Sequence, residues 1–200
     1  MKMLQHDYIV RLLDVFENKD EMYLVMEQLP GGDLFKWLDK RDFKIKESKC
    51  KEIAYQIATA LEYMHSFGIC HRDIKPENIL MTNESDDAKL KLVDFGLSKI
   101  LGPGEKCSES FGTLSYAAPE VLLQKPYDRT IDSFSLGVII FMMCGGFLPF
   151  DDRDERKIAK KTLFQEPDYN YRTFNDVSKE VKELMRKMLV KKGSERFDMT

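Results

Sequence analysis

Apolar and polar residues follow two different periodicities in the first third of the chain. Residues 12–16 and 22–27 are short runs rich in apolar, β-branched and aromatic side chains, separated by a polar turn at residues 18–20. This arrangement predicts a β hairpin. Between residues 48 and 67, apolar side chains recur at helical spacing, and Gly68 follows the last of them. The sequence therefore predicts an amphipathic helix that ends at this glycine.

The second half of the chain is predicted to be mainly helical. A strand is expected at residues 89–93, and helices are expected at roughly 120–124, 131–144, 154–164 and 178–190. The run 134–150 is almost wholly apolar and approaches the length of a membrane-spanning helix. However, Gly145, Gly146 and Pro149 interrupt this run near its end. A helix that is apolar all round lies either in lipid or at the centre of a domain. Together the patterns predict an α+β fold, with a small hairpin followed by a helical body.

Composition and charge narrow the class of protein. The chain has 200 residues, of which 43% are hydrophobic and 32% charged, as expected for one globular domain. A net charge of −3 provides no basic face for nucleic acid or an anionic membrane. The four cysteines show neither CxxC spacing nor a histidine at metal-ligand spacing, which predicts reduced thiols in a cytoplasmic protein. The first residues lack the long apolar core of a signal peptide.

Residues 71–78, with the sequence HRDIKPEN, contain three groups suited to phosphoryl transfer. Asp73 can accept a proton from a hydroxyl, Lys75 can neutralise a phosphate, and Asn78 can ligate a divalent metal. The apolar residues 79–81 follow this loop and predict a short strand. Taken alone, the segment is also compatible with an ordinary salt-bridged loop.

The order of further motifs favours the functional interpretation. Asp94-Phe95-Gly96, Gly112-Thr113 and Ala118-Pro119-Glu120 follow the loop in that order. The ordered set resembles the signature of eukaryotic protein kinases. The resemblance implies a protein kinase-like fold in which residues 1–29 are a remnant of the small lobe and hinge. Residues 30–200 would form the mainly helical large lobe, so the apolar run described above is interpreted as its buried central helix.

This resemblance implies a role for each polar residue of the catalytic segment. Asp73 would orient and deprotonate the acceptor hydroxyl, and Lys75 would pair with the γ-phosphate of ATP. Asn78 and Asp94 would hold Mg²⁺ ions, which prefer such hard oxygen ligands. Ser/Thr kinases combine the lysine at this position with a threonine just before the Ala-Pro-Glu motif. Thr113 fits that pattern, so the expected acceptors are serine and threonine.

The hairpin resembles the strand and hinge that hold adenine in the family. Met26 corresponds to the residue at the back of the adenine pocket, known as the gatekeeper. The backbone carbonyl of Glu27 and the backbone amide of Leu29 correspond to the groups that bond the adenine edge.

Four more positions complete the implied ATP site. Leu80 and Val93 correspond to the apolar floor below adenine, although ordinary core packing would explain them equally well. Asp33 corresponds to an acidic residue that contacts ribose or a basic substrate side chain, and capping of the helix that begins at Leu34 is the alternative. The resemblance places Asp33 and Glu77 along the peptide groove, so protein substrates are expected to carry a basic residue upstream of the acceptor.

Arg72 and Glu109 are implied to regulate the activation loop. In kinases with an arginine before the catalytic aspartate, a negative charge in this loop pairs with that arginine. Here Glu109 stands where many relatives carry a phosphorylated threonine, and a carboxylate has about half the charge of a phosphate. This feature is similar to calcium-dependent protein kinases and the wider calcium/calmodulin-dependent group. The alternative is that Glu109 is an exposed residue in a mobile loop.

The resemblance also implies structural roles for four residues. Phe95 would pack under His71, so that its position reports whether the preceding aspartate faces the nucleotide. Glu120 and Arg196 would form a buried ion pair that ties the activation segment to the last helices.

The sequence departs from the family at its beginning. These 200 residues contain neither a Gly-rich phosphate loop nor a Val-Ala-Ile-Lys strand, and residue 1 would align near the last turn of the helix that carries the partner of that lysine. We interpret the chain as an N-terminally truncated kinase domain or a fragment of one. The expected function is a protein Ser/Thr kinase that uses ATP and Mg²⁺, with calcium or calmodulin regulation through regions not present here. The alternative is a catalytically inactive, pseudokinase-like binding module.

Overall fold

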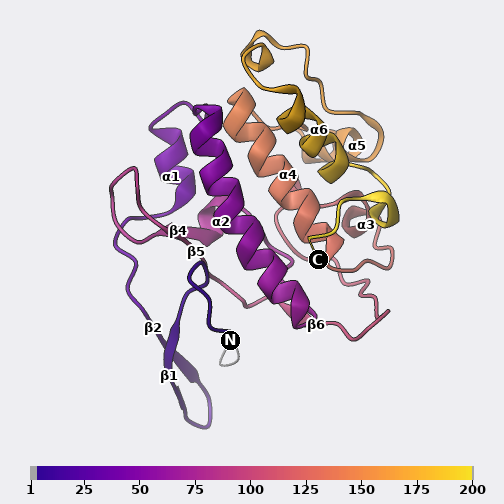
Figure 1. The fold of residues 1–200 in the computed structure, drawn as a ribbon. Helices are drawn as coiled ribbons and strands as arrows, with labels where there is room; N and C mark the ends of the chain where they lie inside the picture. The colour runs from indigo at the N-terminus through magenta and orange to yellow at the C-terminus, as the bar shows by residue number, and fades with distance from the viewer. Residues whose placement is uncertain (1–3, 200) are drawn as a thin grey trace.

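The computed structural model describes residues 4–199, which form a helical body and three two-stranded antiparallel sheets (Figure 1). The expectation that residue 1 belongs to the last turn of a helix lies outside these residues. The helices are α1 (Leu34–Asp39), α2 (Glu47–Ser66), α3 (Pro119–Leu122), α4 (Thr130–Gly145), α5 (Glu155–Phe164) and α6 (Lys179–Met188). The strands are β1 (Leu12–Glu17), β2 (Met22–Met26), β3 (Ile69–Cys70), β4 (Ile79–Met81), β5 (Leu90–Leu92) and β6 (Lys99–Ile100).

The predicted hairpin is present as strands β1 and β2, which project from the helical body (Figure 1). The side chain of Asn18 shapes the turn, because its Oδ1 accepts the backbone N–H groups of Asp20 and Glu21. A register shift lies between Leu12 and Asp14. The hairpin leaves seven large apolar side chains exposed in this structure: Leu13, Phe16, Met22, Tyr23, Leu24, Val25 and Met26.

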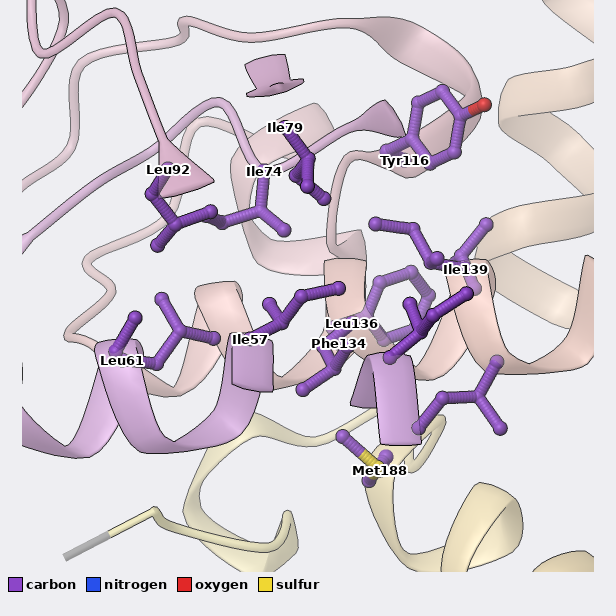
Figure 2. Packing of buried hydrophobic residues seen from close by; sticks show 14 of the residues in the cluster. Ile57, Leu61, Ile74, Ile79, Leu92, Tyr116, Phe134, Leu136, Ile139 and Met188 are labelled. Carbon is purple, nitrogen blue, oxygen red and sulfur yellow. The ribbon is translucent and has the colours of Figure 1, made fainter. Parts of the chain in front are cut away.

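Helices α2 and α4 lie side by side at the centre of the helical body, with α5 and α6 on the other side of α4 (Figure 1). Ile57 and Leu61 are buried on one face of α2, in the same cluster as Phe134 and Leu136 of α4, and Ile57 points toward these two residues (Figure 2). Met188 of α6 closes the same cluster. The apolar stripe of α2 is therefore buried because a second helix covers it, as its amphipathic spacing predicts.

The apolar run at residues 134–150 is a buried central helix and its C-terminal turn. Every residue of α4 is buried, and Gly146 ends the helix in the left-handed region at φ 86°, with its N–H donating to the carbonyl of Met142. The chain then returns so that the ring of Phe150 stacks on that of Phe134. Within residues 4–199, no helix combines the length and apolar character needed to cross a membrane.

The short strand pair β4–β5 positions two of the segments that carry the kinase motifs. In the β4–β5 pair, Ile79 lies opposite Leu92, and the backbone N–H of Val93 donates to the carbonyl of Asn78 at 3.0 Å. This antiparallel pairing brings the residue before β4 and the residues after β5 to the same end of the sheet. Asn78 and Asp94, which are far apart in sequence, are therefore neighbours of one short ladder.

A buried ion pair links the segment after the activation loop to the end of the chain. Arg196 Nη1 lies 2.6 Å from Glu120 Oε1, and Nη2 lies 2.9 Å from Oε2. The side chain of Arg196 is fully buried, so loss of one partner would leave an uncompensated charge. Such losses cost about 3–5 kcal/mol of folding free energy.

Element boundaries differ from the sequence expectations by a few residues. The helix expected over 178–190 spans Lys179–Met188, because the hydroxyl of Ser178 caps its first turn through the N–H of Val181. The helix expected from residue 120 is only the four residues Pro119–Leu122, with proline in its first turn. The Ser178 cap and the proline of α3 account for where these two helices begin.

Gly137 provides a test of how closely α4 and α6 pack. A Cβ at this position would lie 2.8 Å from the Cβ of Met188 and 3.1 Å from a methyl group of Leu189. We expect Gly137→Ala to lower the free energy of unfolding by about 1–2 kcal/mol, because overpacking outweighs the gain in helix propensity. Denaturant unfolding measures the change. The control Gly102→Ala, whose Cβ would meet only a glutamate side chain at 3.4 Å, is expected to change stability by less than about 0.5 kcal/mol. Equal stability of the two variants would contradict the packing argument.

Candidate active site

Asp73 lies at the centre of a cluster of polar side chains in the loop between β3 and β4. Its Oδ2 is 2.7 Å from Lys75 Nζ and accepts a hydrogen bond from Asn78 Nδ2 at 2.9 Å. Its Oδ1 accepts a hydrogen bond from the hydroxyl of Thr113 at 3.0 Å. Lys75 also donates to that hydroxyl at 2.8 Å. The structure thus brings together four of the five residues expected to be catalytic, from two segments about 40 residues apart.

A buried carboxylate on helix α4 holds the backbone of this loop. Asp132 accepts the backbone N–H groups of His71 and Arg72 at 2.8 and 2.9 Å, and the ring Nε2 of His65 at 2.9 Å. Burial would raise the pKa of Asp132, but the hydrogen bonds that it accepts from His65 and from the backbone of His71 outweigh burial and lower the pKa below its ordinary value. Asp132 is therefore the anchor of the loop.

Sequence reasoning did not identify Asp132 or His65 as functional. The available signal was a single acidic residue inside an otherwise apolar helical run. A carboxylate in such a run requires buried donors, but the sequence does not show that those donors are the N–H groups of the loop. His65 lies on the buried face of α2, where a histidine is often an ordinary core residue.

His71 is a neutral, fully buried residue beneath the site. Its Nδ1 accepts the N–H of Asp73 at 3.3 Å, so Nε2 carries the proton and donates to the carbonyl of Val93 at 3.1 Å. Burial lowers the pKa of His71, in agreement with the neutral ring. The ring of Phe95 lies 5.3 Å from the ring of His71, so this pair packs together as expected.

Asn78 and Asp94 occupy the end of the β4–β5 ladder where metal ligation is expected. The side-chain Nδ2 of Asn78 donates to Asp73. The side-chain Oδ1 of Asn78 is therefore the atom that would ligate a metal. Asp94 is exposed, and its Oδ1 accepts only the local N–H of Gly96 at 3.2 Å. In the described part of the chain, no cluster of three or more His, Cys, Asp or Glu could hold a metal. One carboxylate and one amide oxygen nevertheless suit Mg²⁺, which retains waters and binds phosphate oxygens as well.

The hinge after β2 presents free backbone groups. The N–H of Glu27 donates to the carbonyl of Arg11 at 3.0 Å, and its side chain pairs with Lys91 at 2.6 Å. Within residues 4–199, no hydrogen bond uses the carbonyl of Glu27 or the N–H of Leu29. Both groups are therefore available to a planar ligand with one donor and one acceptor. Met26 is exposed beside them and lines a hollow of about 510 Å³ that also reaches Asp94.

The four remaining expected ATP-site residues occupy different environments. Leu80 and Val93 are half-buried, and a backbone bridge joins Leu80 to Asp33. Asp33 caps α1, because its Oδ1 accepts the N–H of Lys36 at 2.8 Å and its Oδ2 pairs with the ammonium of the same lysine at 2.9 Å. Helix capping, the alternative given above, is thus observed at Asp33. Glu77 is exposed next to the catalytic loop.

A charge pair connects the catalytic loop with the activation segment. Arg72 Nη1 lies 2.6 Å from Glu109 Oε2, and Lys99 Nζ lies 3.5 Å from the same oxygen. The hydrogen bond from Arg72 is the largest of the effects that lower the pKa of Glu109 to about 2. Cys107 and Tyr127, which sequence reasoning missed, also contact the arginine, each at 3.4 Å. Glu109 is therefore a paired residue in this structure.

Comparison with known proteins gives the family. Residues 1–200 match the model of the protein kinase domain family. A probable myosin light chain kinase of Dictyostelium discoideum is 38% identical over 199 residues, which cover 98% of this chain and 50% of that protein. A calcium/calmodulin-dependent protein kinase type 1 of Macrobrachium nipponense is 34% identical over 190 residues, covering 94% and 54%. A serine/threonine-protein kinase H1 homolog of Pinctada fucata is 35% identical over 199 residues, covering 98% and 48%.

The chain belongs to the protein kinase domain family. The protein kinase-like fold expected from the ordered motifs is confirmed, with mixed helices and small antiparallel sheets. The chain spans about half the length of the curated relatives it matches.

The Arg72–Glu109 contact predicts an unusual titration of Glu109. Because its pKa is lowered from 4.5 to about 2 in the folded protein, the contribution of the pair to stability is fully present above about pH 4.5. That contribution is lost as the pH falls through about 2. We expect the ¹³C shift of the Glu109 carboxyl carbon to change little between pH 6 and pH 3.5.

Two variants serve as comparisons in this titration. Arg72→Ala should move the midpoint up toward 4.5, because the largest cause of the shift is removed. Lys99→Ala should produce a smaller upward shift. A wild-type midpoint near 4.5, or one that Arg72→Ala leaves unchanged, would contradict the pairing.

Proposed function

We propose that this chain is the catalytic part of a protein Ser/Thr kinase, which transfers the γ-phosphoryl group of ATP to serine and threonine hydroxyls. The observation that supports this most directly is the position of Asp73, which Thr113, Lys75 and Asn78 contact at 2.7–3.0 Å. Catalysis of phosphoryl transfer depends mainly on positioning and charge neutralisation. A carboxylate held by three donors is well suited to orient one further hydroxyl.

In this proposal each residue of the cluster has a distinct role. Asp73 accepts a hydrogen bond from the acceptor hydroxyl and finally takes its proton. Lys75 is close enough to serve both Asp73 and a phosphate oxygen, since its flexible ammonium has three donors. Thr113 fixes the direction of Asp73 through its hydroxyl, which supports the assignment to Ser/Thr rather than Tyr acceptors.

ATP and Mg²⁺ are the proposed cofactors. The carbonyl of Glu27 and the N–H of Leu29 would bond the adenine edge, with Met26 behind it and with Leu80 and Val93 below it. Bound Mg²⁺ would neutralise the charge that develops on the phosphates. The proposed protein ligands of Mg²⁺ are the side-chain Oδ1 of Asn78 and the carboxylate of Asp94.

The Arg72–Glu109 pair supports a permanently charged activation loop. Glu109 supplies a fixed negative charge where other kinases need a phosphate, so the proposed enzyme does not depend on phosphorylation of this loop. Membership of the calcium/calmodulin-dependent group is also part of the proposal, supported by the relative from Macrobrachium nipponense. Any control by calcium or calmodulin would act through regions beyond these 200 residues. The proposed location is the cytoplasm, in keeping with four free cysteines.

A second candidate function is a catalytically inactive binding module, in which residues 1–200 act without a Gly-rich loop and its partner lysine. Without those groups the phosphates of ATP lose several charge-assisted contacts, each of which contributes about 1.5–3 kcal/mol. We therefore propose that transfer requires a glycine loop and a lysine strand supplied ahead of residue 1.

A chimera tests the proposed function and separates it from the binding module. A glycine loop and lysine strand from an active family member are fused before residue 1, and transfer of ³²P from ATP to a Ser/Thr peptide mixture is measured. We expect transfer by the chimera and none by residues 1–200 alone. Asp73→Asn in the chimera should lower kcat by about 10²–10⁴-fold, because the base that orients the hydroxyl is lost.

Nucleotide affinity is the control in this experiment, since Asp73→Asn should leave ATP binding nearly unchanged. A correctly folded chimera that binds ATP but transfers no phosphate would support the inactive module. Full activity of the Asp73→Asn chimera would refute the role of Asp73.

Substrate choice is a further expectation of the proposal. Glu77 is exposed beside the catalytic loop, whereas Asp33 is already paired with Lys36. We expect a preference for arginine about three residues before the acceptor, and we expect Glu77→Gln to weaken it roughly 2- to 5-fold, as for one exposed charge pair. A positional peptide library scored by kcat/KM measures the preference. An arginine preference that is absent, or unchanged in Glu77→Gln, would contradict this role of Glu77.

A further inference from the structure

Two buried cysteines meet where the ends of the two central helices lie side by side. Cys50 lies in the first turn of α2 and Cys144 in the last turn of α4, and their Sγ atoms are 3.6 Å apart. The two positions are 94 residues apart in sequence, and each residue is 2% exposed. Within residues 4–199, neither Cys70 nor Cys107 has a second sulfur at hydrogen-bonding distance.

The two thiols differ in environment. Cys144 lines a surface hollow of about 600 Å³ whose walls include Lys44, Glu47 and Val177, whereas Cys50 does not line it. The hydrogen bond between the sulfurs lowers the pKa of Cys144 and raises the pKa of Cys50. The thiolate is the reactive form of cysteine. Cys144 is therefore the thiol that the geometry favours for reaction with a small oxidant entering through the hollow, and the direction of its pKa shift agrees with this assignment.

We propose that Cys50 and Cys144 form a modification site at which a hydroperoxide generates an intramolecular disulfide. The Cys144 thiolate attacks one oxygen of hydrogen peroxide, so that an S–O bond forms and the O–O bond breaks, and the departing hydroxide takes up the proton that Cys144 has lost and leaves as water. The Cys50 sulfur then attacks the sulfenic sulfur, so that an S–S bond forms and the S–O bond breaks, and the departing hydroxide takes up the Cys50 proton and leaves as a second water. Two thiols are oxidised and one peroxide is reduced.

The required movement is small. A disulfide bond is about 2.05 Å long, so the sulfurs must approach each other by roughly 1.5 Å from their present contact. Because the pair is already in contact in the folded protein, closure does not depend on unfolding or on a second molecule.

The disulfide would link α2 and α4 covalently at one end of this helix pair. A hydrogen bond already connects the two helices at the other end. At that other end, His65 of α2 contacts Asp132 of α4 at 2.9 Å, and Asp132 holds the catalytic loop. A covalent link across about 94 residues restricts the unfolded chain. We therefore expect the melting temperature of the oxidised protein to rise by about 5–15 °C.

Peptide mapping under native conditions tests the proposal. The chain is treated with hydrogen peroxide, free thiols are blocked with N-ethylmaleimide, and the protein is digested with trypsin. Cleavage after Lys49 and Lys51 releases Cys50 in a dipeptide, and Cys144 lies in the peptide 130–153. We expect a cross-linked pair of these two peptides that dithiothreitol separates. Cys107→Ser should retain the cross-link, whereas Cys50→Ser and Cys144→Ser should lose it.

Each outcome of this experiment either supports or overturns the proposed disulfide between Cys50 and Cys144. The cross-link, in protein that keeps its circular dichroism spectrum and gains thermal stability, supports the site. Blocked thiols at both positions after prolonged treatment would overturn it, as would sulfinic acid at Cys144 or a link between two protein molecules. The wild-type map remains decisive even where a serine variant fails to fold.

Discussion

The carboxylate of Asp132 is the interaction on which the arrangement of the site depends. The catalytic loop contains a non-glycine residue, Arg72, at φ 72°, and such a conformation costs about 1–3 kcal/mol. Hydrogen bonds to a charged group contribute about 1.5–3 kcal/mol each, and Asp132 accepts two from the backbone at this point. The hydrogen bonds therefore outweigh the strain. They also fix the direction in which Asp73 leaves the loop.

This dependence explains why a charged residue lies inside the most apolar helix of the protein. All sixteen residues of α4 are buried, so its aspartate would be unstable without donors. His65 and two loop N–H groups supply them, so the helix pair and the loop share one set of buried hydrogen bonds. The core and the site are thus parts of a single structure, and the exposed β1–β2 hairpin is the part least tied to it.

The sequence predicted what local patterns encode. The hairpin, the stripe of α2 and the buried α4 follow from periodicity, and the cluster around Asp73 follows from motifs whose residues are close in sequence or in known order. Contacts that depend on helix packing were not predicted. His65 meets Asp132 across 67 residues and Cys50 meets Cys144 across 94, and neither pair has a local signature. Cys107 was interpreted as a scattered thiol because nothing in its neighbourhood indicates contact with Arg72.

The hydrogen bonds of Asp73 have a consequence for the fidelity of the proposed reaction. A carboxylate offers about four lone-pair directions, and Thr113, Lys75 and Asn78 use three of them. A single direction is left, and in solution a water molecule competes for it with any peptide hydroxyl. Water in that place is itself a nucleophile, so a loosely held peptide would turn phosphate transfer into futile hydrolysis of ATP. The affinity of the groove for the peptide, more than the basicity of Asp73, would then determine the fraction of ATP that is hydrolysed without transfer to the peptide.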